Sequence, residues 1–230
     1  MKTDVSNAWS DAILHRSLFN GFFMAGFECS THRLRSGRRL DLIASTRHDQ
    51  FAREDYERLR AHGIQVAREG VRWHLVEQQP ARYDFSSVAP IVEAARATGT
   101  QVIWDLCHFG WPDHLDIFKT EFVHALATYG AAFASWLASE TGENGYFVPV
   151  NEISFLSWAA GDEDSFFPFE TGRGFELKAQ LVRAAIYAMD AIWAEQPESR
   201  FVHVDPIIHV VARPTRPQED RKSTRLNSSH

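Results

Sequence analysis

The sequence predicts an α/β protein made of repeated strand–helix units. Five short runs rich in apolar and β-forming residues alternate with four amphipathic helical segments, a pattern typical of a parallel sheet. The repeat favours a (β/α)8 TIM barrel, with an open doubly wound sheet as the alternative. A complete barrel takes about 250 residues, whereas this chain of 230 residues provides only five predicted strands. We therefore expect a TIM barrel that is truncated after about strand five.

Composition narrows the classes of partner. Hydrophobic residues make up 44% of the chain, which is enough for a substantial core. A formal net charge of -6 argues against a nucleic-acid partner. The sequence shows no export signal and no apolar run long enough to span a membrane, so we expect a cytoplasmic protein without a membrane partner.

Cysteine usage and motifs argue against a cofactor or a metal. Cys29 and Cys107 lie far apart in strand-like runs, where small buried thiols fit better than a disulfide or a metal pair. Zinc-ligand spacings, a Walker loop and the GxGxxG motif are all missing from the sequence. We therefore expect no cofactor and no metal.

The first predicted strand covers residues 22–27 and leads into a polar loop. Residues 33–49 carry five arginines, whose charges are most simply explained by solvation. A charged helix over residues 53–61 stops at Gly63, and a second strand follows over residues 66–73.

On this second strand Arg68 shares a face with Val66, Gly70 and Arg72, because strand side chains alternate. An arginine inside a barrel strand is costly unless it pairs with carboxylates. We place Arg72, at the end of the strand, on the rim or the surface.

The third predicted strand covers residues 101–106. His108 follows it and shares a face, at period two, with Val102, Trp104 and Leu106. We expect this row to point inward, with His108 at the carboxyl end. A histidine in such a place is as often a structural donor as a residue that holds a ligand.

The fourth predicted strand covers residues 147–152 and ends in Asn151 and Glu152. In parallel α/β folds the chemistry lies at the carboxyl ends of the strands, so Glu152 can be a proton donor there. The pair can also be a helix cap or a surface pair.

A long loop over residues 158–174 follows, rich in acidic and aromatic residues, with Trp158 at its start. Its aromatic side chains can stack on sugar faces, which makes Trp158 a candidate substrate-binding residue, or the loop can pack on itself. A fourth crossover helix over residues 176–195 and a fifth strand over residues 201–204 complete the pattern.

Three strand-end segments occur in order: Arg68 to Trp73, His108 to Pro112, and Asn151 with Glu152. Over about residues 22–205 the chain resembles the first half of a clan A glycoside hydrolase, and in particular family 1, the β-glucosidase family. In that family the three segments read approximately Arg-Phe-Ser-x-x-Trp, His-Trp-Asp-x-Pro and Asn-Glu-Pro. Departures from the pattern include Phe109, Gly110 and Ile153.

The resemblance implies a retaining O-glycosidase that binds a small carbohydrate or glycoside. It implies that Glu152 is the general acid and base, that Asn151 binds the sugar 2-hydroxyl, that His108 holds a neighbouring hydroxyl, and that Arg68 orients the nucleophile. Retention needs a second carboxylate about 5 to 5.5 Å away, which the family places on strand seven. We therefore expect this chain alone to be inactive. The alternative is a non-catalytic sugar-binding or regulatory barrel, or such a barrel within a fusion protein.

Residues 220–230 resemble, residue for residue, the in-frame translation of a common sequencing adapter. A natural polar tail has a similar composition. We expect residues 1–219 to be the N-terminal portion of a glycosidase barrel domain and residues 220–230 to be non-native. The open edge of such a sheet predicts aggregation when the chain is expressed alone.

Overall fold

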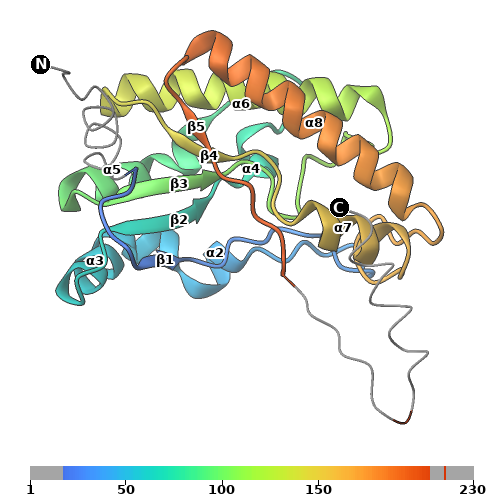
Figure 1. Cartoon of the computed structure of the whole chain (residues 1–230), viewed down its shortest axis with the longest axis horizontal. Coiled ribbons are helices and arrows are strands. Elements are labelled where there is room, and N and C mark those ends of the chain that lie inside the picture. The colour runs from blue at the N-terminus through green and yellow to red at the C-terminus, as the bar shows by residue number, and fades with distance from the viewer. Residues whose placement is uncertain (1–17, 208–214, 216–230) are drawn as a thin grey trace, which may run out of the picture.

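The computed structural model describes residues 18–207 and residue 215 (Figure 1). The tail at residues 220–230 lies outside the described residues. Five parallel strands form one sheet in the order β1-β2-β3-β4-β5. Their bounds are β1 (Met24–Gly26), β2 (Val66–Gly70), β3 (Gln101–Asp105), β4 (Tyr146–Val148) and β5 (Arg200–Phe201). Each strand pairs with the next one in the chain, which is the strand order of a barrel, because a doubly wound sheet reverses its order at a switch point.

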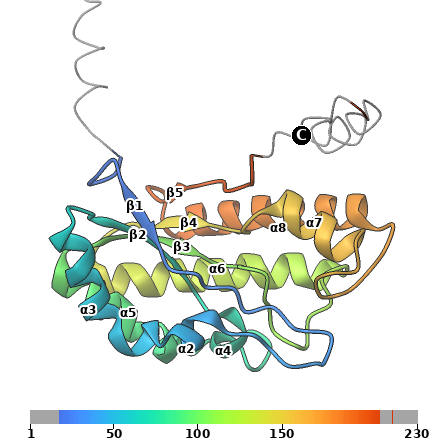
Figure 2. The same cartoon turned by 90° about the horizontal axis from the view of Figure 1, so that it is seen from below.

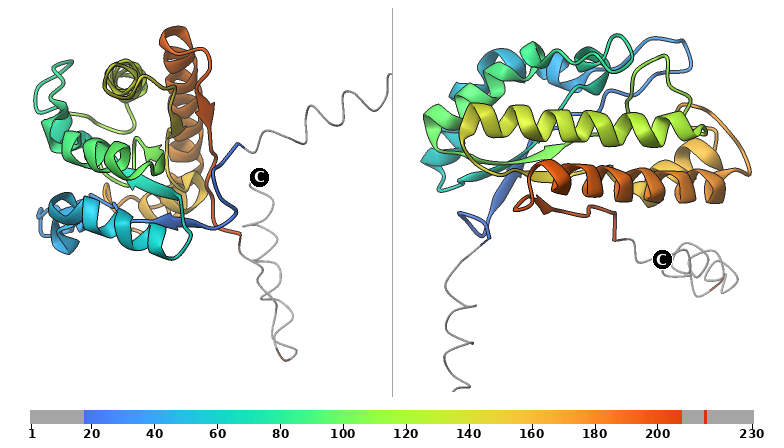
Figure 3. Two further views of the ribbon diagram at one scale, coloured as in Figure 1. Left: turned by 90° about the vertical axis from the view of Figure 1, so that its left-hand side faces the viewer. Right: turned by 90° about the horizontal axis from the view of Figure 1, so that it is seen from above.

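Helices connect these strands. The long ones are α3 (His48–Ala61), α5 (Ala89–Thr98), α6 (Thr120–Thr141) and α8 (Gly174–Glu195). They lie together on one face of the curved sheet (Figure 3), and α6 packs on α8 as α3 packs on α5 (Figure 2). Shorter turns fill the connections: α2 (Leu42–Thr46), α4 (Trp73–Val76), η1 (Phe85–Ser87) and α7 (Ile153–Gly161). Within residues 18–207, no helix has both the length and the apolar character needed to cross a membrane. The cytoplasmic location stays a prediction.

The sheet separates a large core from a small one. The large core lies between the sheet and the helices, where the rings of Trp104 on β3 and Phe133 on α6 are 5.6 Å apart. The small core lies on the opposite, inward face and contains the buried side chains of Val66, Ile103 and Val148. The inward face is the one that a closed barrel encloses.

The inward row of β3 differs from the prediction. Ile103 belongs to the small core, so alternation places Asp105 on the inward face and Trp104 on the helix face. The prediction that Trp104 and Leu106 point inward together with His108 is therefore wrong. The wide helix–sheet core takes the bulky apolar side chains, and Asp105 is the last inward residue of the strand.

Element boundaries also shift. β2 ends at Gly70 instead of residue 73, Trp73 begins α4, and β4 ends at Val148. Gly70 and Val148 both lie opposite Asp105, where the ladder of β3 stops, so the neighbouring strands stop there too. Trp158 lies within α7 and not in a loop.

The prediction of a rim or surface position for Arg72 is wrong. Its exposed fraction is only 7%. Its Nη1 lies 3.0 Å from Asp49 Oδ2, and its Nη2 donates to the carbonyl of Ser87 at 3.1 Å. Because β2 ends before Arg72, alternation no longer decides its direction, and carboxylates from the connection between β1 and β2 compensate its burial.

Solvation is also the wrong interpretation for two arginines of the loop after β1. The Arg33 guanidinium lies 4.4 Å from the ring centre of Phe167, within the range of a cation–π contact. Arg39 donates to the carbonyls of Thr31 and Trp111 at 2.7 and 3.0 Å. These contacts tie the loop after β1 to the segments that follow β3 and α7.

Two glycines let the segment after β1 approach the sheet closely. A Cβ at Gly70 would lie 2.3 Å from the Cβ of Cys29, and a Cβ at Gly110 would lie 2.4 Å from the carbonyl oxygen of Thr31. Side chains essentially never approach so closely, so these positions require glycine for space.

We expect Gly70→Ala to lower the free energy of unfolding by roughly 1–3 kcal/mol, because the added methyl group must displace Cys29. Urea titration measures this change. Gly21→Ala is the matched control, since the nearest atom to its new Cβ lies at an ordinary 3.5 Å. Equal stability of the two variants would show that β1 does not pack as described.

A buried polar network lies on the helix face of β2. Glu69 is fully buried, and its Oε1 accepts from the Tyr56 hydroxyl at 2.6 Å and lies 3.0 Å from His48 Nε2. His48 Nδ1 lies 2.9 Å from Asp55 Oδ2. Burial raises the pKa of Glu69. Burial acts to lower the pKa of His48, but hydrogen bonds and charges from Glu69 and Asp55 outweigh it, and the pKa is raised.

Stability should therefore fall as the pH rises across neutrality. His48 binds its proton more tightly in the folded chain than in the unfolded chain, where the pKa is about 6.5. The contribution of His48 to the free energy of unfolding is complete below this unfolded-state pKa. It is lost as the pH rises through the raised folded-state pKa. The raised pKa of Glu69 also makes the free energy of unfolding fall as the pH rises, and this fall begins at the ordinary pKa of a glutamate, which is lower than that of histidine.

The measurement is the free energy of unfolding at about pH 6 and about pH 8, where the slope cannot exceed roughly 1.4 kcal/mol per pH unit for one group. We expect His48→Gln to lose most of the slope and His62→Gln, at the exposed end of α3, to keep it. A His48→Gln variant with an undiminished slope would contradict the assignment.

Candidate active site

Polar side chains gather at the carboxyl ends of the first four strands. A cavity of about 180 Å³ lies there, lined by Gly26, Phe27, Glu28, Arg68, Asp105 and His108. Two of the sequence-predicted residues, Arg68 and His108, therefore share one cavity. Asp105 was not singled out from the sequence, although an acidic residue inside an apolar strand, next to a strand that carries Arg68, is a usable signal.

Arg68 and Asp105 form an ion pair inside the sheet. Arg68 Nε donates to Asp105 Oδ1 at 3.1 Å, and Nη2 lies 2.7 Å from Oδ2, so the contact is bidentate. Asp105 is fully buried, and such a charge is tolerated only with a close partner. Asp105 therefore provides the carboxylate partner that we expect for an arginine inside a barrel strand.

Asn151 is held by the same guanidinium. Its Oδ1 accepts from Arg68 Nη2, and its backbone N–H donates to the carbonyl of Cys107 at 3.0 Å. The side chain is fully buried, yet its Nδ2 has no hydrogen-bond partner among the described residues. Buried donors are rarely left unpaired, so this nitrogen calls for a further acceptor.

Glu152 follows Asn151 and begins α7. Its backbone is in the left-handed region, with φ 46° and ψ 60°, a conformation that costs a residue with a side chain about 1–3 kcal/mol. The backbone N–H donates to the carbonyl of Val204 at 3.0 Å. Its half-buried carboxylate forms no hydrogen bond or ion pair with the described residues. It can therefore contact a ligand at the end of β4.

His108 lies between three groups. Its Nδ1 is 3.0 Å from Asp105 Oδ2 and 2.9 Å from Cys29 Sγ, while its Nε2 is 3.4 Å from Glu28 Oε1. Burial, followed by the nearby Asp105 charge, raises the pKa of the Cys29 thiol well above its usual value. The predicted burial of both cysteines is confirmed.

Cys29, Asp105 and His108 are also the residues that could hold a metal, since one donor atom of each lies within 4.8 Å of the others. Arg68, however, already contacts both oxygens of Asp105, and the thiol holds its proton firmly. These features describe a hydrogen-bonded cluster better than a set of free metal ligands.

Trp158 does not join the cavity. Its exposed fraction is 41%, and its ring lies 6.0 Å from that of Phe155. The aromatic residues of the following loop pack on the rim: Phe166 is 5.6 Å from Phe109 and 5.4 Å from Phe155. The structure thus favours the self-packed interpretation of this loop.

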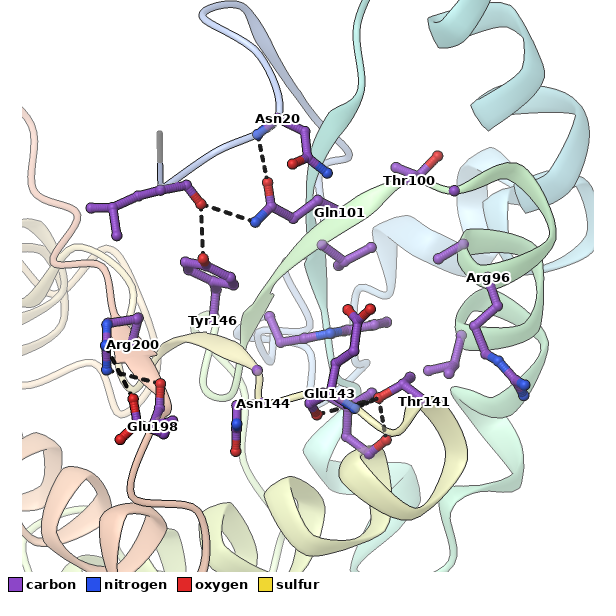
Figure 4. A pocket seen from close by; sticks show the side chains of 18 residues that line it. Asn20, Arg96, Thr100, Gln101, Thr141, Glu143, Asn144, Tyr146, Glu198 and Arg200 are labelled. Atoms are coloured by element: carbon purple, nitrogen blue, oxygen red, sulfur yellow. Dashed lines mark hydrogen bonds and ion pairs between the residues drawn. The ribbon is translucent and has the colours of Figure 1, made fainter. Parts of the chain in front are cut away.

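A larger cavity, of about 770 Å³, lies at the opposite end of the strands (Figure 4). Two of its polar side chains are joined to the segment before β1: Tyr146 donates to the carbonyl of Leu18 at 2.8 Å, and Gln101 accepts from the N–H of Asn20 at 2.9 Å. The amino ends of barrel strands serve stability, whereas chemistry lies at the carboxyl ends. We therefore assign the candidate active site to the cavity of about 180 Å³ at the carboxyl ends, although it is the smaller of these two cavities.

Comparisons with known proteins bear on the fold. No family model and no curated protein sequence matches the chain. Among solved structures, the AHE enzyme from Alicyclobacillus herbarius aligns with a TM-score of 0.66 at 14% identity, over 77% of this chain and 41% of that one. The family 1 β-glucosidase from Thermotoga maritima, in complex with isofagomine lactam, aligns with a TM-score of 0.63 at 16% identity, over 78% and 42%.

A third neighbour, the β-glycosidase BGL167, aligns with a TM-score of 0.54 at 20% identity, over 67% of this chain and 44% of that one. This chain therefore spans less than half the length of each of these neighbours. At these identities the likeness concerns the fold. The chain has the fold of the first part of a family 1 glycosidase barrel.

Proposed function

We propose that this chain is the first part of a retaining O-glycoside hydrolase of the β-glucosidase type, with Glu152 as the general acid and base. The observation that carries the proposal is the pair at the end of β4. Asn151 presents a buried amide donor, and Glu152 presents a carboxylate, neither of which is paired among the described residues. An unpaired donor beside an unpaired acid at the carboxyl end of a barrel strand suits a polar substrate.

The chemistry follows from two carboxylic acids on opposite sides of a glycosidic bond. Glu152 protonates the leaving oxygen while a second carboxylate, about 5 to 5.5 Å away, attacks the anomeric carbon. Glu152 then removes a proton from the water that hydrolyses the glycosyl intermediate. Asn151 Nδ2 donates to the sugar 2-hydroxyl, His108 holds a neighbouring hydroxyl, and Arg68 orients the second carboxylate.

Trp158 would contact only the outer part of a bound glycoside, because its side chain is exposed on α7. The substrate of this site is a small carbohydrate or glycoside. The neighbouring structures support that class, since one of the Thermotoga maritima β-glucosidase structures contains castanospermine and another contains cyclophellitol.

We propose that residues 1–219 are the N-terminal portion of the barrel domain and that residues 220–230 are not native. Exposed apolar side chains support further βα units. Val182, Ile186 and Trp193 on α8 are 41%, 46% and 43% exposed, and Phe22 beside β1 is 92% exposed. A following helix on α8 and a last strand beside β1 would cover such surfaces in a closed barrel.

Long-read sequencing of the source gene tests this division. We expect the reading frame to diverge from the present sequence near residue 220 and to continue through three more βα units, with a glutamate closing the seventh strand. A gene that encodes residues 220–230 and then stops would disprove it.

In the longer protein we expect Glu152→Gln to abolish hydrolysis of glycosides with poor leaving groups while sparing much of the activity on activated aryl glycosides, because only poor leaving groups need an acid. A general acid of this kind contributes about 10²–10⁴-fold. Steady-state kinetics on both substrate types, with Glu163→Gln on the loop after α7 as the control, provide the measurement. An equal loss on both substrates would argue against the acid role.

The second candidate is a non-catalytic sugar-binding or regulatory barrel, alone or within a fusion protein. Phe109 favours it, because this residue replaces the tryptophan of the family motif and packs against Phe155 and Phe166, outside the cavity lining. A seventh strand without a glutamate would select this candidate.

A further inference from the structure

His108 is the one cavity-lining residue that lies between two carboxylates. Asp105 Oδ2 is 3.0 Å from Nδ1 on one side of the imidazole ring, and Glu28 Oε1 is 3.4 Å from Nε2 on the other. In a neutral imidazole one nitrogen donates and the other accepts, so the position of the proton decides what the cavity presents to a ligand.

Asp105 decides the position of that proton. Its carboxylate already accepts from Arg68 Nε and lies 2.7 Å from Nη2, so it acts as an acceptor toward the ring as well. A lone pair on Nδ1 would face a carboxylate oxygen at 3.0 Å, which is repulsive, whereas an N–H there donates to it. The protonated form of Nδ1 is therefore favoured.

Cys29 is the competing donor, because its Sγ lies 2.9 Å from Nδ1. The same thiol lies 3.6 Å from Asp105 Oδ2 and can donate its hydrogen there. With S–H directed to the carboxylate, the sulfur lone pairs face the Nδ1–H, and all three groups are satisfied together. In the opposite arrangement the thiol donates its hydrogen to Nδ1. No hydrogen would then lie between Nδ1 and Asp105 Oδ2, although these two atoms are only 3.0 Å apart.

Glu28 does not change this assignment. Its Oε1 accepts from the backbone N–H of Ser30 at 3.0 Å, and its side chain is 57% exposed. The 3.4 Å separation from Nε2 exceeds the roughly 2.7–2.9 Å of a charge-assisted hydrogen bond. Nε2 and Oε1 are thus two neighbouring acceptors at the edge of the cavity, which hydroxyl donors can approach from the cavity side.

We propose that Asp105 is a positioning residue that fixes His108 in the tautomer protonated at Nδ1, so that His108 Nε2 and Glu28 Oε1 present a pair of acceptors to the substrate. Adjacent hydroxyls of a sugar ring, each donating one hydrogen, match such a pair. The identification of the ligand as a sugar rests on the proposed function, whereas the tautomer of His108 does not.

Nitrogen-15 NMR of the histidine side chains in the longer protein tests the tautomer directly. At about pH 7.5 we expect a pyrrole-type Nδ1 and a pyridine-type Nε2 for His108. His108→Gln identifies its signals by their loss. A wild-type spectrum with His108 protonated at Nε2, or at both nitrogens, would overturn the proposal without any variant.

Asp105→Asn provides the second arm, because its amide can donate to Nδ1. We expect the two nitrogen shifts of His108 to exchange, giving the Nε2–H tautomer. Asp55→Asn is the matched control: Asp55 Oδ2 lies 2.9 Å from Nδ1 of His48, so this change should alter the His48 signals and leave those of His108 in place. A folded Asp105→Asn chain with unchanged His108 shifts would also refute the positioning role.

These NMR measurements need no turnover, so they separate this proposal from the glycosidase proposal. If the tautomer is as stated and the longer protein hydrolyses no glycoside, only the proposed function fails. If glycosides are hydrolysed, Asp105→Asn should raise KM more than it lowers kcat, and the increase should shrink for substrates that lack one of two adjacent hydroxyls.

Discussion

An ion pair between the partly buried Arg68 of β2 and the fully buried Asp105 of β3 is the contact on which the site depends. The desolvated Asp105 charge is tolerated because the two side chains meet at two points, which also fixes their relative orientation. Each partner then positions another group: Arg68 holds the oxygen of Asn151, and Asp105 faces the ring of His108. Loss of Arg68 would leave the buried Asp105 carboxylate without its compensating charge, at a cost of about 3–5 kcal/mol. Stability and site geometry therefore rest on the same pair.

The departures from the family motif are coupled to the segment after β1. Gly70 stands where the motif has serine, and its lack of a side chain makes room for Cys29. Gly110 stands where the motif has aspartate, and Thr31 occupies the space that a Cβ would need. These glycines allow the close approach of the segment after β1, which brings Glu28 to the cavity. They are better understood as one rearrangement than as separate losses of catalytic residues.

The parallel sheet could be predicted because alternation of strands and helices is a repeated, chain-wide signal, whereas alternation only favoured the strand order of a barrel over that of a doubly wound sheet. Single side chains were harder. The phase of β3 was misjudged because Trp104 and His108 share a period, although the tryptophan belongs to the helix core, and Asp105 was missed with it. Arg72 and Trp158 lie beyond the strand ladders, where periodicity no longer indicates direction. Pairing partners far apart in sequence decide such positions, and one sequence does not reveal them.

The two ends of the sheet present different polar groups. At the amino ends, Gln101 and Tyr146 are joined to the segment before β1 by hydrogen bonds, which is what a structural face requires. At the carboxyl ends, the Asn151 amide and the Glu152 carboxylate lack partners within residues 18–207, beside a strained backbone. Leaving polar groups unpaired is costly unless a ligand or another part of a closed barrel completes them. An unpaired amide beside an unpaired acid on a strained backbone is therefore the physical feature that favours the carboxyl end as the place where a ligand binds.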